Sequence, residues 1–556
     1  MKKFIWILLL VTIILGSVLR LWQLGNIPPS PDWDEASLGY DAYSILHTGR
    51  DQFGKFLPVD LRSFNDYKPA FYAYLVMPSI YIFDLNIFAV RFPSAIFGIL
   101  SVLATYFLVK ELFSIGPKTL RPKAQELLAL LSALFMAISP LSIQFSRVGF
   151  ESNVGTAFNI FAALFFLKGL KKPWLLSVSI ACAGLAIYTY QSEKVFTPLL
   201  LLMLVLLSWK KLILINKKYL VSAFVIGMVV IFPMIQNIIT DKSSLERLRG
   251  TSVFSSQTEL LKAGLRKLDR DEQNNDQLGL LLDNRRIIYA KTILQGYFSH
   301  FDLNWLFVEG DIARHHAHGM GIMYLFELPF LLLGIYSLLT SGKFDRRAKL
   351  IVFLWILITP IPASVTVGVP SAVRTLNFLP MLQILTAVGI LSAFEFFKNR
   401  NLKKASYILI LTSYILFSLF NILYFLNQYF VQSNYYDSAY WQYGYKEAVN
   451  ESLKLQNKYQ KIVVSNSETM NQSHIFFLFY LKYPPQDYQE IIKNQSKDVV
   501  DNSFGKYIFR EVDWEKDSLL KNVLFIAAPN EIPKEVQTIK TIYSLDGTPV
   551  IKIAGT

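Results

Sequence analysis

The chain opens with the apolar run FIWILLLVTIILGSVLRLWQ (residues 4–23), and the segment PDWDEASLGYD (residues 31–41) follows it closely. About 20 consecutive apolar residues are enough to cross a bilayer as a helix. Two adjacent carboxylates, Asp34 and Glu35, are costly so near the end of such a helix unless the protein uses them. The two segments together predict a membrane protein whose chemistry lies where the chain leaves its first span.

The composition supports a membrane protein. Of the 556 residues, 53% are hydrophobic and only 17% are charged, whereas soluble domains carry about 25% charged residues. The net charge of +14 would suggest nucleic acid in a soluble protein, but no basic helix or aromatic RNA-type motif accompanies it. Topology signals and attraction to anionic lipid explain the excess better. The single cysteine, Cys182, excludes a disulfide framework and a cysteine-based metal site.

The distribution of Lys and Arg predicts the topology. Short segments on one side of the predicted spans hold 21 basic residues, and the opposite short loops hold three; the basic side is expected to be cytoplasmic. The first span lacks a small-residue cleavage site, so it is expected to be retained. Residues 69–84 are expected to form an interfacial or re-entrant helix on the outer face, because a further span there would place the basic segments outside. Eleven spans follow, at residues 4–23, 87–109, 125–143, 152–168, 174–190, 195–209, 219–239, 319–340, 350–368, 371–395 and 405–427, with the C-terminus outside.

The predicted fold class is a mainly α polytopic membrane protein with a small extracytoplasmic α/β domain. The membrane domain is expected over residues 1–430, with outer loops at 24–86 and 240–318, and the soluble domain over 431–556. The second loop contains a possible amphipathic helix around Leu260, Leu261, Leu265 and Leu268. The soluble domain shows a helical pattern over 439–459 and strand patterns over 461–464, 507–512, 523–528 and 541–544.

Ionisable residues gather at the outer ends of the predicted spans. Cations at a water–lipid boundary suit a lipid phosphate, and carboxylates suit deprotonation of an attacking hydroxyl. This pattern favours an enzyme with a substrate that is part lipid and part polar. Besides Asp34 and Glu35, the candidates are Lys68, Arg147, Glu151, Lys194, Arg314, His315, His318 and Arg374.

Each candidate has a structural alternative. Asp34 and Glu35 could cap a helix that begins near Ala36, because acids favour helix N-termini. Lys194 and Arg374 could be snorkelling anchors. His315, His316 and His318 resemble a metal cluster, but no carboxylate or cysteine spacing supports one. No phosphate-binding glycine loop, dinucleotide fingerprint or nucleophile elbow occurs in the sequence.

Several motifs resemble the bacterial relatives of the dolichyl-phosphate-mannose–protein mannosyltransferases and the lipid A aminoarabinose transferases, which are family 39-like glycosyltransferases of the GT-C fold. The resemblance covers roughly residues 1–430. Ala70 departs from the second proline that the family often has after its lysine. The matching pieces are Asp34-Glu35-Ala36, Lys68-Pro69-Ala70-Phe71-Tyr72, Arg91-Phe92-Pro93-Ser94, Arg147 with Glu151, Lys194, and Arg374 with Pro380.

The resemblance implies transfer of a sugar from a polyprenyl-phosphate carrier to an acceptor hydroxyl on the outer face, with inversion at the anomeric carbon. Asp34 would be the general base and Glu35 would assist or orient it. Lys68, and with it Lys194 or Arg374, would hold the phosphate. Arg147, Glu151, Arg314, His315 and His318 would be further substrate-site candidates. No cofactor is implied, although a divalent metal stays open, and the acceptor could be a protein, a lipid or a glycan.

Two other functions remain as alternatives. A flippase or transporter for polyprenyl-linked glycans would place its charges midway through the membrane, whereas here they lie at span ends. The oligosaccharyl-transferring branch of the same fold would need a divalent metal and a larger outer domain. The expected location is the cell membrane, with the active site and the C-terminal domain outside.

Overall fold

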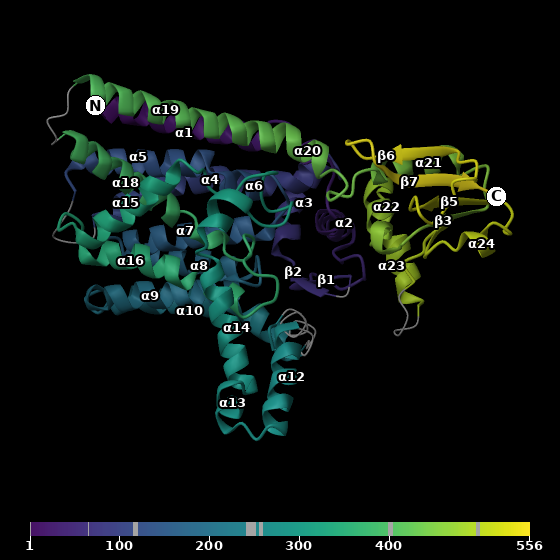
Figure 1. Ribbon diagram of the computed structural model, residues 1–556, viewed down its shortest axis with the longest axis horizontal. Helices are drawn as coiled ribbons and strands as arrows, with labels where there is room; N and C mark the ends of the chain where they lie inside the picture. The colour runs from purple at the N-terminus through teal and green to yellow at the C-terminus, as the bar shows by residue number, and fades with distance from the viewer. Residues whose placement is uncertain are drawn as a thin grey trace.

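The computed structural model describes residues 2–64, 66–114, 120–240, 252–254, 259–398, 404–495 and 501–556. It contains a long helical bundle, a helical arm on one side of the bundle, and a sheet domain beyond one end of it (Figure 1). The first loop, with α2, β1 and β2, lies between the bundle and the sheet domain (Figure 1). The acidic segment is thus enclosed by two parts of the chain that are far apart in sequence.

The bundle is built from apolar helices. Seven of the described helices are long and apolar enough to cross a membrane, or eight if α5 and α6, bent by 54°, form one span. The bend falls at Pro140, where the proline cannot continue the hydrogen-bond ladder. The bundle helices are α1 (Lys2–Leu21), α4 (Ile87–Leu112), α5 (Pro122–Ile138), α6 (Pro140–Ser146), α7 (Glu151–Gly169), α8 (Leu175–Ile187), α9 (Glu193–Leu212), α10 (Lys217–Thr240), α15 (Glu327–Thr340), α16 (Arg346–Ile358), α17 (Ile361–Ser364), α18 (Met381–Lys398) and α19 (Lys404–Asn427).

Every predicted span contains a helix, so a polytopic helical protein is confirmed, whereas the count of eleven stays a prediction. Helices α8 and α15 have 13 and 14 residues, which at 1.5 Å per residue is shorter than a bilayer core of about 30 Å. Two boundaries were predicted wrongly. Helix α15 begins only at Glu327, after a glycine-containing loop, and α18 begins only at Met381, after Pro380. A short 3₁₀ turn, η3 (Leu376–Phe378), precedes α18.

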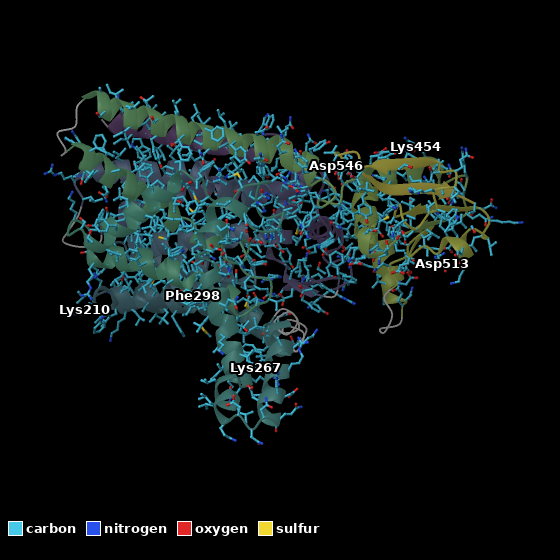
Figure 2. All side chains as sticks on the ribbon, in the orientation of Figure 1. Lys210, Lys267, Phe298, Lys454, Asp513 and Asp546 are labelled. Carbon is cyan, nitrogen blue, oxygen red and sulfur yellow. The ribbon has the colours of Figure 1, made fainter. Side chains whose placement is uncertain are left out.

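The basic residues lie where the predicted topology needs them. Lys210, at the C-terminal end of α9, lies at the end of the bundle remote from the sheet domain, which carries Lys454 and Asp513 (Figure 2). The C-terminal end of α4 and the start of α16 also carry basic residues, Lys110 and Arg346. The basic end and the sheet domain are therefore at opposite ends of the molecule.

The first loop forms a helix, a hairpin and a second short helix. Strands β1 (Asp60–Ser63) and β2 (Asp66–Pro69) pair antiparallel, with Leu61 opposite Lys68. Helix α3 (Phe71–Phe83) is too short to span a bilayer core and packs against α2 (Trp33–Thr48) and α4. A helix was predicted over 69–84, and one is present; the hairpin before it was not predicted.

The arm beside the bundle consists of α12 (Glu259–Gln273), α13 (Gln277–Leu282) and α14 (Arg285–Ser299) (Figure 1). The predicted helix around Leu265 corresponds to α12. Lys267 pairs with Asp271 of the same helix at 3.0 Å and with Asp283 at 2.6 Å, so it joins α12 to the end of α13. The chain returns to the bundle through a π-helical turn, η2 (Trp305–Glu309).

The C-terminal domain is a five-stranded sheet with helices on it, as the predicted α/β class requires. The strand order is β4-β3-β5-β7-β6; β3 is parallel to β4 and β5, and β7 is antiparallel to β5 and β6. The predicted helix over 439–459 is shorter, because Gly444 at φ +112° starts α21 only after a turn. The elements from the end of α19 onward are η4 (Gln428–Gln432), α20 (Ser433–Tyr436), α21 (Tyr445–Leu455), β3 (Lys461–Val464), η5 (Glu468–Met470), α22 (Ser473–Leu481), α23 (Pro485–Lys493), β4 (Tyr507–Phe509), α24 (Trp514–Asp517), β5 (Val523–Ala527), β6 (Lys540–Tyr543) and β7 (Pro549–Gly555).

The domain docks on α2 through one continuous apolar core that contains Leu38, Tyr72, Ile475 and Phe479. Gly39 allows this close approach: a Cβ there would lie 2.7 Å from the Phe479 ring. Docking therefore fixes the first loop from both sides.

Candidate active site

Helix α2 begins at Trp33, two residues after Pro31. Asp32 is its N-cap: an Asp32 side-chain oxygen accepts a hydrogen bond from the Glu35 amide at 2.8 Å. The Asp32 amide donates in return to Glu35 Oε2 at 3.4 Å, which completes a capping box. The helix therefore begins three residues earlier than expected, and Asp32 caps it rather than Asp34. The Trp33 amide donates to Gln442 Oε1 of the C-terminal region at 2.9 Å.

Glu35 is buried in an ion pair with Arg91 of α4. Its side chain is 1% exposed and that of Arg91 is 0% exposed. Arg91 Nε and Nη2 donate to the two Glu35 oxygens at 2.8 and 2.9 Å, and the Gly149 amide donates to Oε1 at 2.8 Å. The remaining Arg91 donors bind the carbonyl oxygens of Leu24, Pro28 and Ser30. Such a bidentate, fully satisfied pair holds α2, α4 and the 24–30 segment together.

Asp34, one residue away, faces open space. Its side chain is 44% exposed, and Oδ1 accepts from the buried Lys68 Nζ at 2.7 Å. Burial alone would lower the pKa of Lys68, but the carboxylates of Asp34 and Glu151 outweigh it and raise that pKa above its usual 10.5. Lys68 is therefore a fixed cation beneath an accessible carboxylate.

Asp34 and Lys68 line a cavity of about 370 Å³ that α2, the β1–β2 hairpin, the start of α7 and the 312–315 segment enclose. Charged, polar and aromatic groups converge in it. Its walls are Asp32, Trp33, Asp34, Ser63, Phe64, Asp66, Lys68, Phe150, Glu151, Tyr190, Ile312, Arg314, His315 and Val373. The cavity combines aromatic and aliphatic walls with paired carboxylates and cations, so it suits a substrate that is part apolar and part polar.

Arg314 crosses the cavity from the segment before α15. Its Nη1 donates to Asp32 Oδ2 at 2.8 Å, and Asp32 is fully buried. The guanidinium carbon lies 4.8 Å from the Trp33 ring centroid and 5.3 Å from that of Tyr440. Stacking between two rings holds the guanidinium plane in one orientation, and it links the cavity to the C-terminal region.

His315 stands next to it on the cavity wall. Its ring lies 5.5 and 5.7 Å from the rings of Phe145 and Phe150. Its Nδ1 is 2.9 Å from Asp311 Oδ2, which also accepts from the Ala372 amide. A carboxylate that fixes one ring nitrogen orients the other.

The other predicted site residues lie elsewhere. Arg147 is fully buried and donates to the carbonyl oxygens of Leu19 and Ile27, so it ties α1 to the loop. Arg374 donates to Thr366 Oγ1 at 2.7 Å and to the carbonyl oxygens of Val367 and Gly368. Neither lines the cavity, and the same is true of Lys194 and Glu35.

The histidine cluster separates in space. His318 stacks on Tyr436, with its Nδ1 3.3 Å from Asp437 Oδ1, whereas His316 Nδ1 faces the carbonyl oxygens of Ala317 and Met320. Among the residues that the structure describes, no group of three His, Cys, Asp or Glu side chains could hold a metal ion.

Comparisons with known proteins give the class. The family described as dolichyl-phosphate-mannose-protein mannosyltransferase matches residues 67–236. ArnT from Cupriavidus metallidurans, solved with undecaprenyl phosphate, superposes with a TM-score of 0.56 at 12% identity, over 100% of this chain and 99% of that one. Its apo structure gives 0.53 over the same shares. The chain has the GT-C glycosyltransferase fold.

A second solved structure with the same fold is that of a longer chain. The archaeal oligosaccharyltransferase AglB from Archaeoglobus fulgidus, solved with an inhibitory peptide and a dolichol-phosphate, gives a TM-score of 0.51 at 12% identity, over 95% of this chain and 69% of that chain. No curated protein sequence matches the chain. The family match and the shared fold together indicate a GT-C glycosyltransferase and a multi-pass membrane protein.

The cavity also contains residues that the sequence did not single out: Trp33, Tyr190 and the capping residue Asp32. A signal existed for Asp32, because Asp followed three residues later by Glu is a capping-box pattern. Nothing local marks Tyr190, which reaches the cavity only because α8 and α9 pack beside α7.

Proposed function

We propose that this chain transfers a sugar from a polyprenyl-phosphate carrier to an acceptor hydroxyl on the outer face of the membrane, with inversion, and that Asp34 is the general base. One observation carries the proposal: an accessible carboxylate, Asp34, shares a cavity with a buried cation, Lys68, while the neighbouring carboxylate is locked in an ion pair. Deprotonation of an attacking alcohol requires such a carboxylate.

The phosphate-binding role is assigned to Lys68 and Arg314, the two cations that line the cavity. Both are paired with carboxylates, Lys68 with Asp34 and Arg314 with Asp32. A donor phosphate that enters the cavity competes with Asp34 for Lys68, so that Asp34 Oδ1 can accept a proton from the acceptor instead. Lys194 and Arg374 lie outside the cavity walls, so the proposal assigns them no contact with the phosphate. A carrier of this kind is present in the solved ArnT and AglB structures.

The reaction is a single displacement. The acceptor oxygen forms a bond to the anomeric carbon as the bond from that carbon to the carrier phosphate oxygen breaks. The proton of the acceptor hydroxyl passes to Asp34, and the carrier leaves as a phosphate monoester with the electrons of the broken bond. Fixed cations stabilise the charge that develops on this phosphate.

Glu35 is proposed as a positioning residue. Its bonds to Arg91 and to the Gly149 amide fix the first turn of α2 and bring the end of α6 against it. Glu151 and His315 line the same cavity as Asp34 and Lys68, and they are proposed to contact the sugar or the acceptor. His318 and Arg147 are proposed to have structural roles only.

The outer location rests on the basic residues at the opposite end of the bundle. A reporter fused after Thr556 and active only outside the cytoplasm would support it. Activity inside the cytoplasm would contradict the eleven-span topology and the interfacial assignment of residues 69–84.

The test of the function is a comparison of envelope glycans, glycolipids and glycoproteins by mass spectrometry. It uses cells with the gene, cells without it, and cells that carry only the Asp34→Asn variant. The proposal expects one glycan to lose a sugar in the second and third strains alike. Identical profiles in all three strains would contradict it.

A further inference from the structure

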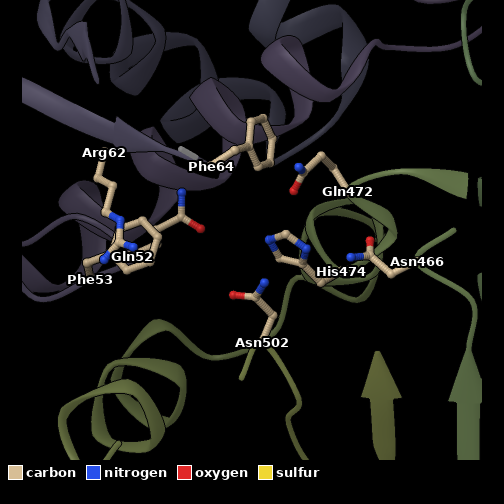
Figure 3. Close-up of a pocket in the computed structure, with 8 residues that line it drawn as sticks. All are labelled: Gln52, Phe53, Arg62, Phe64, Asn466, Gln472, His474 and Asn502. Atoms are coloured by element: carbon tan, nitrogen blue, oxygen red, sulfur yellow. The ribbon is translucent and has the colours of Figure 1, made fainter. Parts of the chain in front are cut away.

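A second cavity lies on the other side of the β1–β2 hairpin, between the first loop and the C-terminal domain. It has a volume of about 200 Å³. Gln52, Phe53, Arg62 and Phe64 line it from the first loop, and Asn466, Gln472, His474 and Asn502 line it from the C-terminal domain. Figure 3 shows these side chains directed toward a common centre from both parts of the chain.

His474 is the buried polar group in this cavity. It is 4% exposed, and its Nδ1 has no hydrogen-bond partner in the described part of the chain. Burial lowers the pKa of this ring to about 3, so the imidazole is neutral, with one donor and one acceptor nitrogen. Phe64 and Phe509 contact it edge-on, with ring centroids 6.0 and 6.1 Å away. A buried nitrogen without a partner is costly and calls for an occupant.

The chemistry of the walls identifies the occupant. Four amides, Gln52, Asn466, Gln472 and Asn502, line the cavity. Gln52 Nε2 already donates to Asp41 Oδ2 and Asn466 Oδ1 accepts from the Ser473 amide, but the remaining amide donors and acceptors match hydroxyl groups, which both donate and accept. The aromatic walls Phe53 and Phe64 suit the apolar face of a ring. Among the described residues that line the cavity, Arg62 is the charged one; it lies 5.1 Å from the Phe53 ring and disfavours a cation.

The position links this cavity to the reaction. Phe64 lines both the second cavity and the one that contains Asp34 and Lys68. A molecule that occupies both sides of Phe64 would place one unit beside the base and another between the two domains. A volume of about 200 Å³ accommodates a single ring rather than an extended peptide.

We propose that this cavity is a saccharide subsite that holds a neutral or acidic sugar of the acceptor, so that the acceptor is itself a glycan or a glycolipid. The assignment of the sugar to the acceptor rests on the proposed function, but the binding of a saccharide can be measured without any turnover.

The test is saturation-transfer NMR on the purified full-length protein in an amine-oxide detergent, which carries no sugar. The probes are the methyl pyranosides of glucose, galactose, mannose, N-acetylglucosamine and glucuronic acid. Asn502→Ala changes a partly exposed wall residue, so it leaves folding intact, and His474→Phe keeps the ring but removes both nitrogens. The matched controls are Asn530→Ala, on the exposed surface of the same domain, and Lys68→Ala, in the first cavity.

The proposal expects saturation transfer to at least one probe. Asn502→Ala and His474→Phe should each weaken the affinity for that probe about 5-fold, which is the effect of one lost hydrogen bond. Both controls should bind the probe within about twofold of the wild type, because Asn530 is exposed on the surface and Lys68 lines the other cavity. Absence of binding by every probe would overturn the proposal, as would binding that only Lys68→Ala weakens, because the sugar would then lie beside Asp34.

A peptide containing Ser and Thr provides a further arm. Binding of this peptide that depends on His474, with no saccharide bound, would also overturn the proposal. If saccharide binding persists while the protein transfers no sugar, the proposed function fails alone. If transfer persists while no saccharide binds, only the subsite fails.

Discussion

Asp34 and Glu35 are adjacent in the chain, but their surroundings differ in every respect that matters for chemistry. The Asp34 side chain is 44% exposed in a cavity, where it accepts a hydrogen bond from Lys68. Glu35 is 1% exposed and receives two bonds from Arg91 and one from Gly149. A group that exchanges a proton with a substrate must be accessible from the cavity. A group that holds three segments together must instead have all its hydrogen-bonding positions satisfied by the protein. The pair therefore divides one acidic motif into a chemical part and a structural part.

The largest expected effect is a loss of folding stability when Glu35, the structural carboxylate, is replaced. Removal of one partner of a buried ion pair costs about 3–5 kcal/mol, so Glu35→Ala should destabilise the protein by about that amount. Asp34→Ala, the matched control, should cost less, because the Asp34 side chain is 44% exposed and the buried Lys68 keeps the carboxylate of Glu151 near it. Denaturant unfolding of the detergent-solubilised protein measures both. Equal losses for the two variants would remove the distinction between the carboxylates.

The next effect concerns the cation below Asp34. Lys68→Ala should weaken binding of the polyprenyl-phosphate donor by about 1.5–3 kcal/mol, the range of a charge-assisted hydrogen bond, or roughly 10- to 150-fold. Lys68→Arg should rescue only part of this loss, because a fork does not replace a point charge. Donor titration against Lys194→Ala and Arg374→Ala gives the control. If either control weakens binding more than Lys68→Ala does, the phosphate site lies outside the cavity.

Binding of the donor through Lys68 should not depend on pH in the physiological range. Its pKa is raised above 10.5 in the folded protein. A raised lysine pKa contributes stability that is complete below the unfolded-state value and is lost only as the pH rises through the folded-state value. Donor affinity that depends on Lys68 should therefore stay constant from about pH 7 to 9. A fall within that window, present in the wild type and absent in Lys68→Arg, would show that the lysine titrates early.

The smallest effect is expected at the histidine outside the cavity. His318 is 43% exposed and pairs with Asp437, so His318→Ala should change turnover and stability by about 0.5 kcal/mol or less. His315→Ala, on the cavity wall, is the matched comparison and should reduce turnover more. A larger loss at His318 would extend the site toward η4 and α20.

The sequence predicted the helical bundle and the gathering of charges at one end because both follow from patterns along the chain. Asp34, Lys68, Glu151, Arg314 and His315 come from separate segments, and the structure brings all five to one cavity. Successive residues of a helix point about 100° apart, so the sequence could indicate that the two carboxylates face differently. It could not indicate which of them is locked, because that depends on Arg91, 56 residues away.

The contact between α2 and the C-terminal domain could not be predicted from the sequence, for the same reason. Gln442 reaches α2, and Tyr440 reaches Arg314, only through tertiary packing, and no local pattern marks either residue. Strand β7 is a different case. Its alternating buried residues, Ile551 and Ile553, form a period-2 pattern that the sequence contains and that was not assigned. Helix α22 is apolar on all sides, and such a run does not distinguish a buried helix from a strand.

The central claim is that Asp34, and not Glu35, takes the proton from the acceptor. The most direct measurement is turnover from a polyprenyl-phosphate sugar in liposomes for Asp34→Asn and Glu35→Gln, each expressed per molecule that still binds donor. Asn keeps the size of Asp and removes the proton acceptor, so Asp34→Asn should lose about 10²-fold or more in turnover, and Glu35→Gln should lose less. Near-wild-type turnover in folded, donor-binding Asp34→Asn would contradict the account.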